Sequence, residues 1–174
     1  MAWQKTIRNP VSTSGVGIHG GQQVNLTLRP APPGTGIVFV RKDLGISIPA
    51  RAENARDQAY ATTLHLRGAE ARTVEHLMAA LSGIGVTNVY VDIDSAEVPI
   101  LDGSALPFVE MLRQAELSEQ GVSIPEILVR TPVFVGDGER WIELRPAAEF
   151  AVDYRVSSDS PAVLRQRFVG VLTP

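Results

Sequence analysis

The chain has 174 residues, of which 44% are hydrophobic and 20% are charged, with a formal net charge of -3 at pH 7. This length and composition are typical of one soluble domain, or of one domain with part of another. The acidic balance gives no sign of a nucleic-acid partner, and the absence of cysteine excludes disulfides, thiolate metal sites and a cysteine nucleophile.

The first ten residues contain Lys5 and Arg8 but no apolar core segment, so they predict neither a signal peptide nor a membrane anchor. No apolar run in the chain approaches the roughly 18–20 residues that are needed to span a bilayer. We therefore expect no membrane span.

Two strands are expected early in the chain. Residues 24–28 alternate apolar and polar side chains, as in a half-buried strand, and residues 37–40 form a second apolar run. The turn-rich residues 30–36 lie between them, which favours antiparallel pairing of the two strands. Residues 59–66 predict a further strand, followed by a turn at 67–69.

A helix is expected over residues 74–82. Thr73 is a good N-cap, because its hydroxyl can accept an N–H from the first turn, and Gly83 and Gly85 are expected to end the helix. The apolar side chains that recur at helical spacing are Val74, Leu77, Met78 and Leu81.

A strand and a second helix follow. Residues 88–94 alternate and predict a half-buried strand, and residues 102–104 form a turn or cap. An amphipathic helix is expected over residues 107–115. Its buried face is formed by Phe108, Met111 and Leu112. Strands, two helices and strands again predict a two-layer α+β domain of sheet and helices over residues 1–122.

The sequence becomes β-rich after Gly121. Residues 127–135 and 141–144 predict a hairpin with its turn at residues 136–138, and residues 150–156 predict a further strand.

We expect residues 126–174 to be the first strands of a second, similar domain that is truncated. The pair Thr173-Pro174 has the chemistry of a helix start, with Thr as N-cap and Pro at the first helical position. This favours a chain cut from a longer protein, and the alternative is a frayed natural terminus.

The three histidines are the first candidates for chemistry. His76 follows Glu75 in the first turn of the expected helix, where the helix dipole favours the neutral imidazole that binds zinc. An acidic residue in a first helical turn is also common as a cap partner, and a lone histidine there is commonly a surface residue. No second histidine completes a His-Glu-x-x-His motif. His19 lies among the four glycines of residues 15–21, which permit a close approach by a ligand or simply a tight hairpin. His65 lies beside a turn and is expected to be exposed and inert.

Six segments carry a more specific signal together than any of them does alone. In chain order they are GVGIH at 15–19, LTLRPA at 26–31, ATTL at 61–64, TVEHL at 73–77, EVPILDGSA at 97–105 and PFV at 107–109. In their order and spacing they resemble the N-terminal half of the UDP-3-O-acyl-N-acetylglucosamine deacetylases of lipid A synthesis.

The resemblance implies two similar domains with an active site between them, in a cytoplasmic zinc hydrolase. Such an enzyme removes the N-acetyl group from a UDP-linked, acylated glucosamine. By position, Glu75 matches the family's general base and His76 matches one zinc ligand. The positions that fall at or near the family's substrate contacts are Ile18, His19, Tyr60 and Ala61.

The resemblance also implies that most of the site lies outside this chain. A catalytic zinc takes about three protein ligands, and the family's other two, with its acid histidine, would come after residue 174. The chain alone is therefore expected to be inactive and to associate with itself through the incomplete second domain. Two alternatives stay open: a naturally short relative that binds substrate or a partner protein without catalysis, and a separate chain that completes the site.

Overall fold

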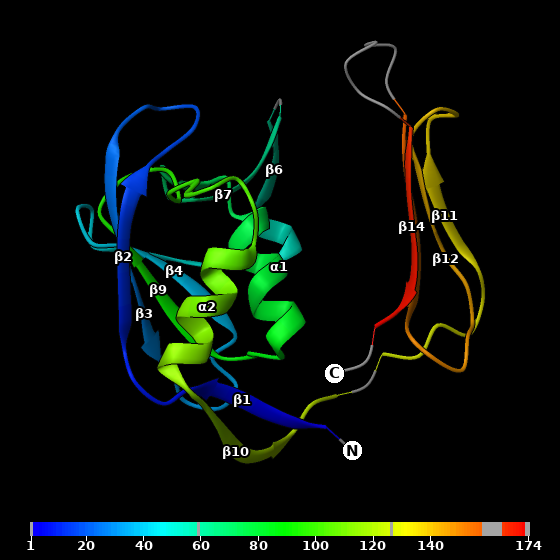
Figure 1. Cartoon of the computed structure of the whole chain (residues 1–174), viewed down its shortest axis with the longest axis horizontal. Coiled ribbons are helices and arrows are strands. Elements are labelled where there is room, and N and C mark those ends of the chain that lie inside the picture. Colours follow the sequence, from blue (N-terminus) through cyan, green and yellow to red (C-terminus); the bar gives the residue numbers. More distant parts are fainter. Residues whose placement is uncertain (1, 59, 126, 158–164, 173–174) are drawn as a thin grey trace. The chain divides into compact units, whose positions relative to one another are not determined.

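The structure is a computed structural model that describes residues 2–58, 60–125, 127–157 and 165–172 (Figure 1). The chain divides into two units, Met1–Ile124 and Pro125–Pro174. None of the helices in the described residues is long and apolar enough to cross a membrane.

A five-stranded sheet forms one layer of the first unit, in the order β2-β3-β9-β4-β5. Its strands are β2 (Val11–Val16), β3 (Gln23–Pro30), β9 (Val89–Ile93), β4 (Ile37–Arg41) and β5 (Ile46–Pro49). Neighbours are antiparallel except for β4 and β9, which are parallel.

The strands expected over residues 24–28 and 37–40 are confirmed as β3 and β4, but their expected pairing is wrong. β9 lies between them, and its residue Val91 is in register with Leu28 on one side and Phe39 on the other. The intervening turn crosses the end of β9, where the Gly36 N–H donates to Asn88 Oδ1 at 2.8 Å. An apolar strand from later in the chain thus replaces the local hairpin.

The second layer consists of the helices α1 (Glu75–Ile84) and α2 (Leu106–Ala115), which lie side by side against one face of this sheet (Figure 1). The core between the layers is apolar. Its fully buried members include Leu26, Leu28, Phe39, Val91 and Ile93 from the sheet and Leu77, Leu81, Phe108 and Leu112 from the helices. Burying each such side chain stabilises the fold by about 1.5–3 kcal/mol. The expected α+β class is confirmed.

The start of α1 differs from the expectation. Thr73 is not the N-cap: that position is Val74, no side chain caps the helix, and the Thr73 hydroxyl donates to Glu97 Oε1 at 3.0 Å. Gly83 lies within the helix, and Gly85 ends it in the left-handed region at φ 82°. The second helix begins at Leu106 and ends at Ala115, close to the expected bounds.

The smaller elements of the first unit surround these layers. A three-stranded sheet contains β6 (Ala55–Gln58), β7 (Ala61–Leu66) and β8 (Ala69–Arg72), preceded by the 3-10 helix η1 (Ala52–Asn54). A separate pair joins β1 (Trp3–Ile7) to β10 (Leu117–Ser123). The strand expected over residues 59–66 begins at Ala61, because Tyr60 lies in a turn, and Ala59 lies outside the described residues.

The second unit contains two antiparallel pairs. One is the hairpin of β11 (Val133–Gly136) and β12 (Trp141–Leu144), and the other joins β13 (Ala151–Val156) to β14 (Gln166–Val171). The expected hairpin is confirmed, although its first strand begins at Val133 rather than at 127. The helix start expected at Thr173-Pro174 lies outside the described residues.

Candidate functional site

Glu75 and His76 are the first two residues of α1, and both are half-buried. Thr62, the second residue of β7, holds this turn at two points. The Val74 N–H donates to the Thr62 carbonyl at 3.3 Å, and Glu75 Oε2 accepts the Thr62 N–H at 3.1 Å. The N–H groups of a first helical turn have no partner within the helix. A carboxylate and an imidazole therefore share an open helix end whose position is set by β7.

The β6–β7 turn contributes the next candidates. Tyr60 is 93% exposed and has a φ of 69°, in the left-handed region that a bulky residue rarely adopts. Ala61 is half-buried and begins β7, directly before Thr62. The hydrogen bond from Thr62 to Glu75 thus brings this turn to the start of α1.

The β2–β3 loop carries Ile18 and His19. It is a tight hairpin in which the Gly17 N–H donates to the Gln22 carbonyl at 3.0 Å and the Gly21 N–H donates to the Gly17 carbonyl at 2.9 Å. Ile18 is 59% exposed. His19 is exposed as well. The loop therefore presents an apolar side chain and an imidazole to solvent.

A buried carboxylate connects this loop to the start of α1. Glu97 is 5% exposed and accepts hydrogen bonds from the His19 N–H at 2.9 Å, the Gly20 N–H at 2.7 Å and the Thr73 hydroxyl at 3.0 Å. Burial raises the pKa of this carboxyl, but the three donors outweigh it and the pKa lies below its ordinary value. The proximity of the His19 side chain lowers the pKa of Glu97 further, to a smaller extent than the hydrogen bonds.

Sequence reasoning assigned no role to Glu97. The one signal available was an acidic residue directly before the apolar run Val98-Pro99-Ile100-Leu101, where a solvated side chain is not expected. Its partners lie 24 to 78 residues away in the chain, so no local pattern identifies them.

The expectation that His65 is exposed is wrong. His65 is half-buried, and it lies opposite Glu70 in the β7–β8 register. It belongs to the end of β7 that faces the Arg67-Gly68 turn, whereas Ala61 and Thr62 form the other end.

The described residues do not form a metal site by themselves. Within residues 2–58, 60–125, 127–157 and 165–172, no group of three or more His, Asp or Glu side chains could hold a metal ion. A catalytic zinc needs about three protein ligands. His76 is therefore a potential ligand without neighbours to complete the set.

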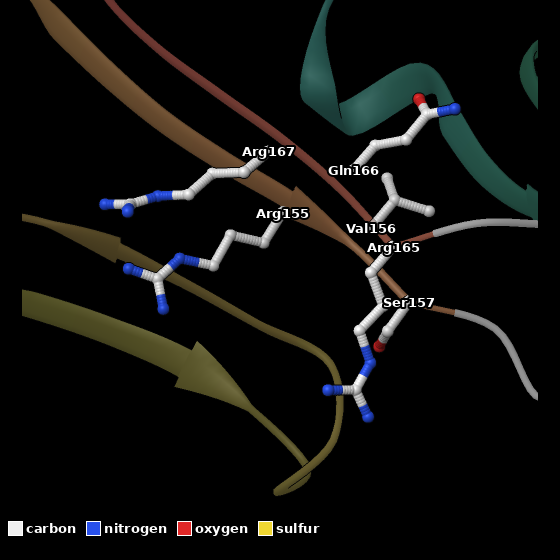
Figure 2. Close-up of a pocket in the computed structure, with 6 residues that line it drawn as sticks. All are labelled: Arg155, Val156, Ser157, Arg165, Gln166 and Arg167. Atoms are coloured by element: carbon white, nitrogen blue, oxygen red, sulfur yellow. The ribbon is translucent and has the colours of Figure 1, made fainter.

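A hollow of about 330 Å³ lies at the end of the β13–β14 pair (Figure 2). It is lined by Arg155, Val156, Ser157, Arg165, Gln166 and Arg167. The guanidinium groups of Arg155 and Arg167 both pair with Asp153, at 3.1 and 2.9 Å. The hollow contains none of the candidate residues, so it does not belong to the candidate site.

Comparison with known proteins gives consistent matches. A family model described as UDP-3-O-acyl N-acetylglycosamine deacetylase matches residues 4–174. A UDP-3-O-acyl-N-acetylglucosamine deacetylase from Idiomarina loihiensis is 45% identical over 166 residues, which are 94% of this chain and 54% of that protein. The protein of the same name from Myxococcus xanthus is 46% identical over 95% of this chain and 53% of its own length. The protein of the same name from Shewanella loihica is 41% identical over 170 residues, which are 96% of this chain and 56% of that protein. The chain spans about half the length of the curated relatives it matches.

Proposed function

The chain belongs to the UDP-3-O-acyl-N-acetylglucosamine deacetylase family, and from this premise we propose that it carries the general-base part of a deacetylase active site. The reaction is the hydrolytic removal of the N-acetyl group from UDP-3-O-acyl-N-acetylglucosamine in lipid A biosynthesis. Glu75 is the general base. The observation that supports this most is the half-buried Glu75 carboxylate at the open end of α1, held by the Thr62 N–H at 3.1 Å and followed directly by His76.

The hydrogen bond from Thr62 suits Glu75 to this role. It engages Oε2 and so fixes the rotation of the carboxylate. The second oxygen, Oε1, is then the atom that accepts a proton from water. As the water oxygen adds to the acetyl carbonyl, Glu75 takes the proton that the water loses. Cleavage of the C–N bond then releases acetate and the amine, which needs a proton from an acid outside the 174 residues.

The described residues do not fit a catalytic zinc by themselves, since no group of three possible ligands occurs among them. We propose that His76 is one ligand of a zinc ion whose other ligands come from outside these residues. A zinc ion in such a site would lower the pKa of bound water and polarise the carbonyl.

The substrate side of the proposal rests on the two turns beside α1. Ile18 and His19 in the β2–β3 loop, with Tyr60 and Ala61 at the β6–β7 turn, are proposed to contact the UDP-linked acylated glucosamine. Ile18 is 59% exposed and Tyr60 is 93% exposed, so both side chains are accessible to a substrate. The proposal places the protein in the cytoplasm.

The second unit is proposed to be the beginning of a second domain, with residues 1–122 as the first domain and 126–174 as its incomplete partner. Its strands expose an unusual number of large apolar side chains. They are Val133, Phe134, Val135, Trp141, Ile142, Leu144, Tyr154, Phe168, Val169 and Val171. Two-stranded sheets are marginal unless a face is covered, so we propose that this unit associates with itself when no further chain covers it.

The proposal is tested by completing the site. The chain is joined in frame to the part of the Myxococcus xanthus relative that lies beyond the matched region, and acetate release from UDP-3-O-acyl-N-acetylglucosamine is measured. Activity in the joined protein, with none above background in the chain alone, supports the proposal. A joined protein that folds, binds zinc and releases no acetate contradicts it.

A further inference from the structure

The carboxylate of Glu97 joins two segments that are distant in the sequence. Its Oε1 accepts the His19 N–H and the Thr73 hydroxyl, and its Oε2 accepts the Gly20 N–H. His19 and Gly20 belong to the β2–β3 loop, and Thr73 lies two residues before Glu75. One side chain therefore contacts both the loop and the entry to α1.

The group that makes these contacts is a buried carboxylate, largely removed from water. A buried carboxylate is unfavourable unless hydrogen bonds replace its hydration, and Glu97 is 5% exposed. No ion pair found among the described residues includes Glu97, so its charge is balanced mainly by two backbone N–H groups and one hydroxyl. If the loop moved away, the carboxylate would lose two of its three donors.

Gly17 shows how closely the loop is seated. A Cβ at this position would lie 2.4 Å from Glu97 Oε2 and 2.7 Å from its carboxyl carbon. A Cβ at Gly20 would lie 3.1 Å from the same oxygen. Gly17 and Gly20 were expected to permit a close approach by a ligand, and in the structure they permit the approach of the Glu97 carboxylate.

At the entry to α1, Glu97 accepts a hydrogen bond from a residue with a strained backbone, Thr73. Thr73 has a φ of 56°, which is an outlier for a β-branched side chain, and it is 3% exposed. The backbone of Glu97 forms a bridge with Arg72, supported by hydrogen bonds from the Arg72 N–H to Ala96 and from the Val98 N–H to Arg72. The hydroxyl of Thr73 then fixes the turn that aims the first residues of α1.

We propose that Glu97 is a positioning residue that clamps the β2–β3 loop to the entry of α1, so that Ile18 and His19 keep a fixed geometry relative to Glu75. The clamp acts through Thr73 and the loop amides and does not touch the substrate. This role rests on the proposed function of Glu75, of Ile18 and of His19.

The loop arm of the test uses the ¹⁵N-labelled joined deacetylase, in which the second unit is expected to be covered, with backbone amide exchange read by NMR. In Glu97→Gln the side chain keeps one acceptor oxygen, which is expected at the Oε1 position because the His19 N–H and the Thr73 hydroxyl both donate there. The NH₂ group then faces the Gly20 N–H and cannot accept from it. Exchange at Gly20 is expected to rise roughly tenfold or more, as for the loss of a hydrogen bond to a charged group. The amides of β9 should stay as protected as in the unsubstituted chain. Unchanged exchange at both His19 and Gly20 would overturn the clamp.

The helix arm uses a matched pair at Thr73, which also serves if Glu97→Gln fails to fold. Thr73→Val keeps the branched shape and removes the donor, whereas Thr73→Ser keeps the donor. Exchange of the Thr62 N–H, which reports the Thr62–Glu75 contact, should rise in the valine variant and be restored in the serine variant. In the joined deacetylase, kcat should fall roughly tenfold in Thr73→Val, more than KM changes, and recover in Thr73→Ser.

The two arms separate this proposal from the proposed function. Equal exchange and equal kcat in the valine and serine variants would overturn the positioning role even if the joined enzyme is active. An unsubstituted joined enzyme without acetate release would overturn the proposed function, while exchange at His19, Gly20 and Thr62 would still decide whether the clamp exists.

Discussion

The Thr62 N–H donates to Glu75 Oε2 at 3.1 Å, while the Thr62 carbonyl accepts the Val74 N–H at 3.3 Å. One residue of β7 therefore holds both the backbone entering α1 and the first side chain of that helix. This double contact holds the β6–β7 turn next to Glu75. The turn and the start of α1 can therefore contact the same substrate.

The first prediction concerns the metal. The 174-residue chain should show no stoichiometric tight zinc, because no group of three or more possible ligands occurs within the described residues. Equilibrium dialysis of the chain against zinc measures this, with His76→Ala as the matched variant. Tight zinc that disappears in His76→Ala would mean that His19 or a second copy completes a site, and the prediction would be wrong.

The second prediction concerns association. The apolar strands of the second unit should make the chain dimerise or aggregate, and residues 1–124 alone should remain monomeric. Phe134 and Trp141, whose rings stack with centroids 6.1 Å apart on exposed strands, are suitable probes. Sedimentation velocity should show less association for Phe134→Ser with Trp141→Ser than for the unsubstituted chain. A monomeric chain that melts in one cooperative transition would contradict the prediction.

The third prediction compares two leucines of α2. Leu112 is fully buried, whereas Leu106 is 54% exposed on the same helix. Leu112→Ala should lower the free energy of unfolding by about 2–5 kcal/mol, since it removes buried methyl groups and leaves a cavity. Leu106→Ala should cost less than about 1 kcal/mol, because most of its side chain already contacts water. Urea unfolding of the two variants checks the difference, and equal losses would contradict the assignment of the core.

The fourth prediction is a pH dependence. The pKa of Glu97 is lowered in the folded chain, because the loop amides and Thr73 outweigh the effect of burial. A carboxyl with a lowered folded pKa stabilises the fold fully above its ordinary value of 4.5, and this contribution is lost as the pH falls through the lowered pKa. The difference in unfolding free energy between the unsubstituted chain and Glu97→Gln should thus be constant near neutral pH and shrink in acid.

His19 is the titratable group that faces Glu97 from the β2–β3 loop, so His19→Gln is the control for this measurement. The acid loss should persist in the His19→Gln background. A difference that does not change between pH 7 and pH 3 would show that the carboxylate of Glu97 is not the titrating group.

The sequence predicted those parts of the fold that depend on neighbouring residues. The alternation of Val89, Val91 and Ile93 identified β9, and the spacing of Phe108, Met111 and Leu112 identified α2. The order of the sheet was not predictable, because β9 pairs with strands about 50 to 60 residues earlier in the chain and alternation does not name a partner. β2 was missed, since its sequence VSTSGV has only weak apolar alternation on an edge strand.

In the candidate site too, the local structure was predictable from the sequence and the long-range contacts were not. The Thr73-to-Leu77 segment was enough to place Glu75 and His76 in a first helical turn. It was not enough to predict the role of Thr73, whose hydroxyl binds Glu97 instead of capping the helix. A capping threonine and one that donates to a distant carboxylate have the same local sequence, so only the tertiary structure distinguishes them.

The central claim is that Glu75 is the general base, and the most direct measurement is acetate release by the joined deacetylase. Glu75→Gln keeps an oxygen that can accept the Thr62 N–H but cannot take a proton from water, so the rate should fall by roughly 10²–10⁴-fold. His65→Ala, at the other end of β7, should leave the rate nearly unchanged. If Glu75→Gln retains the full rate while the protein remains folded, Glu75 is not the base and the proposed mechanism is wrong.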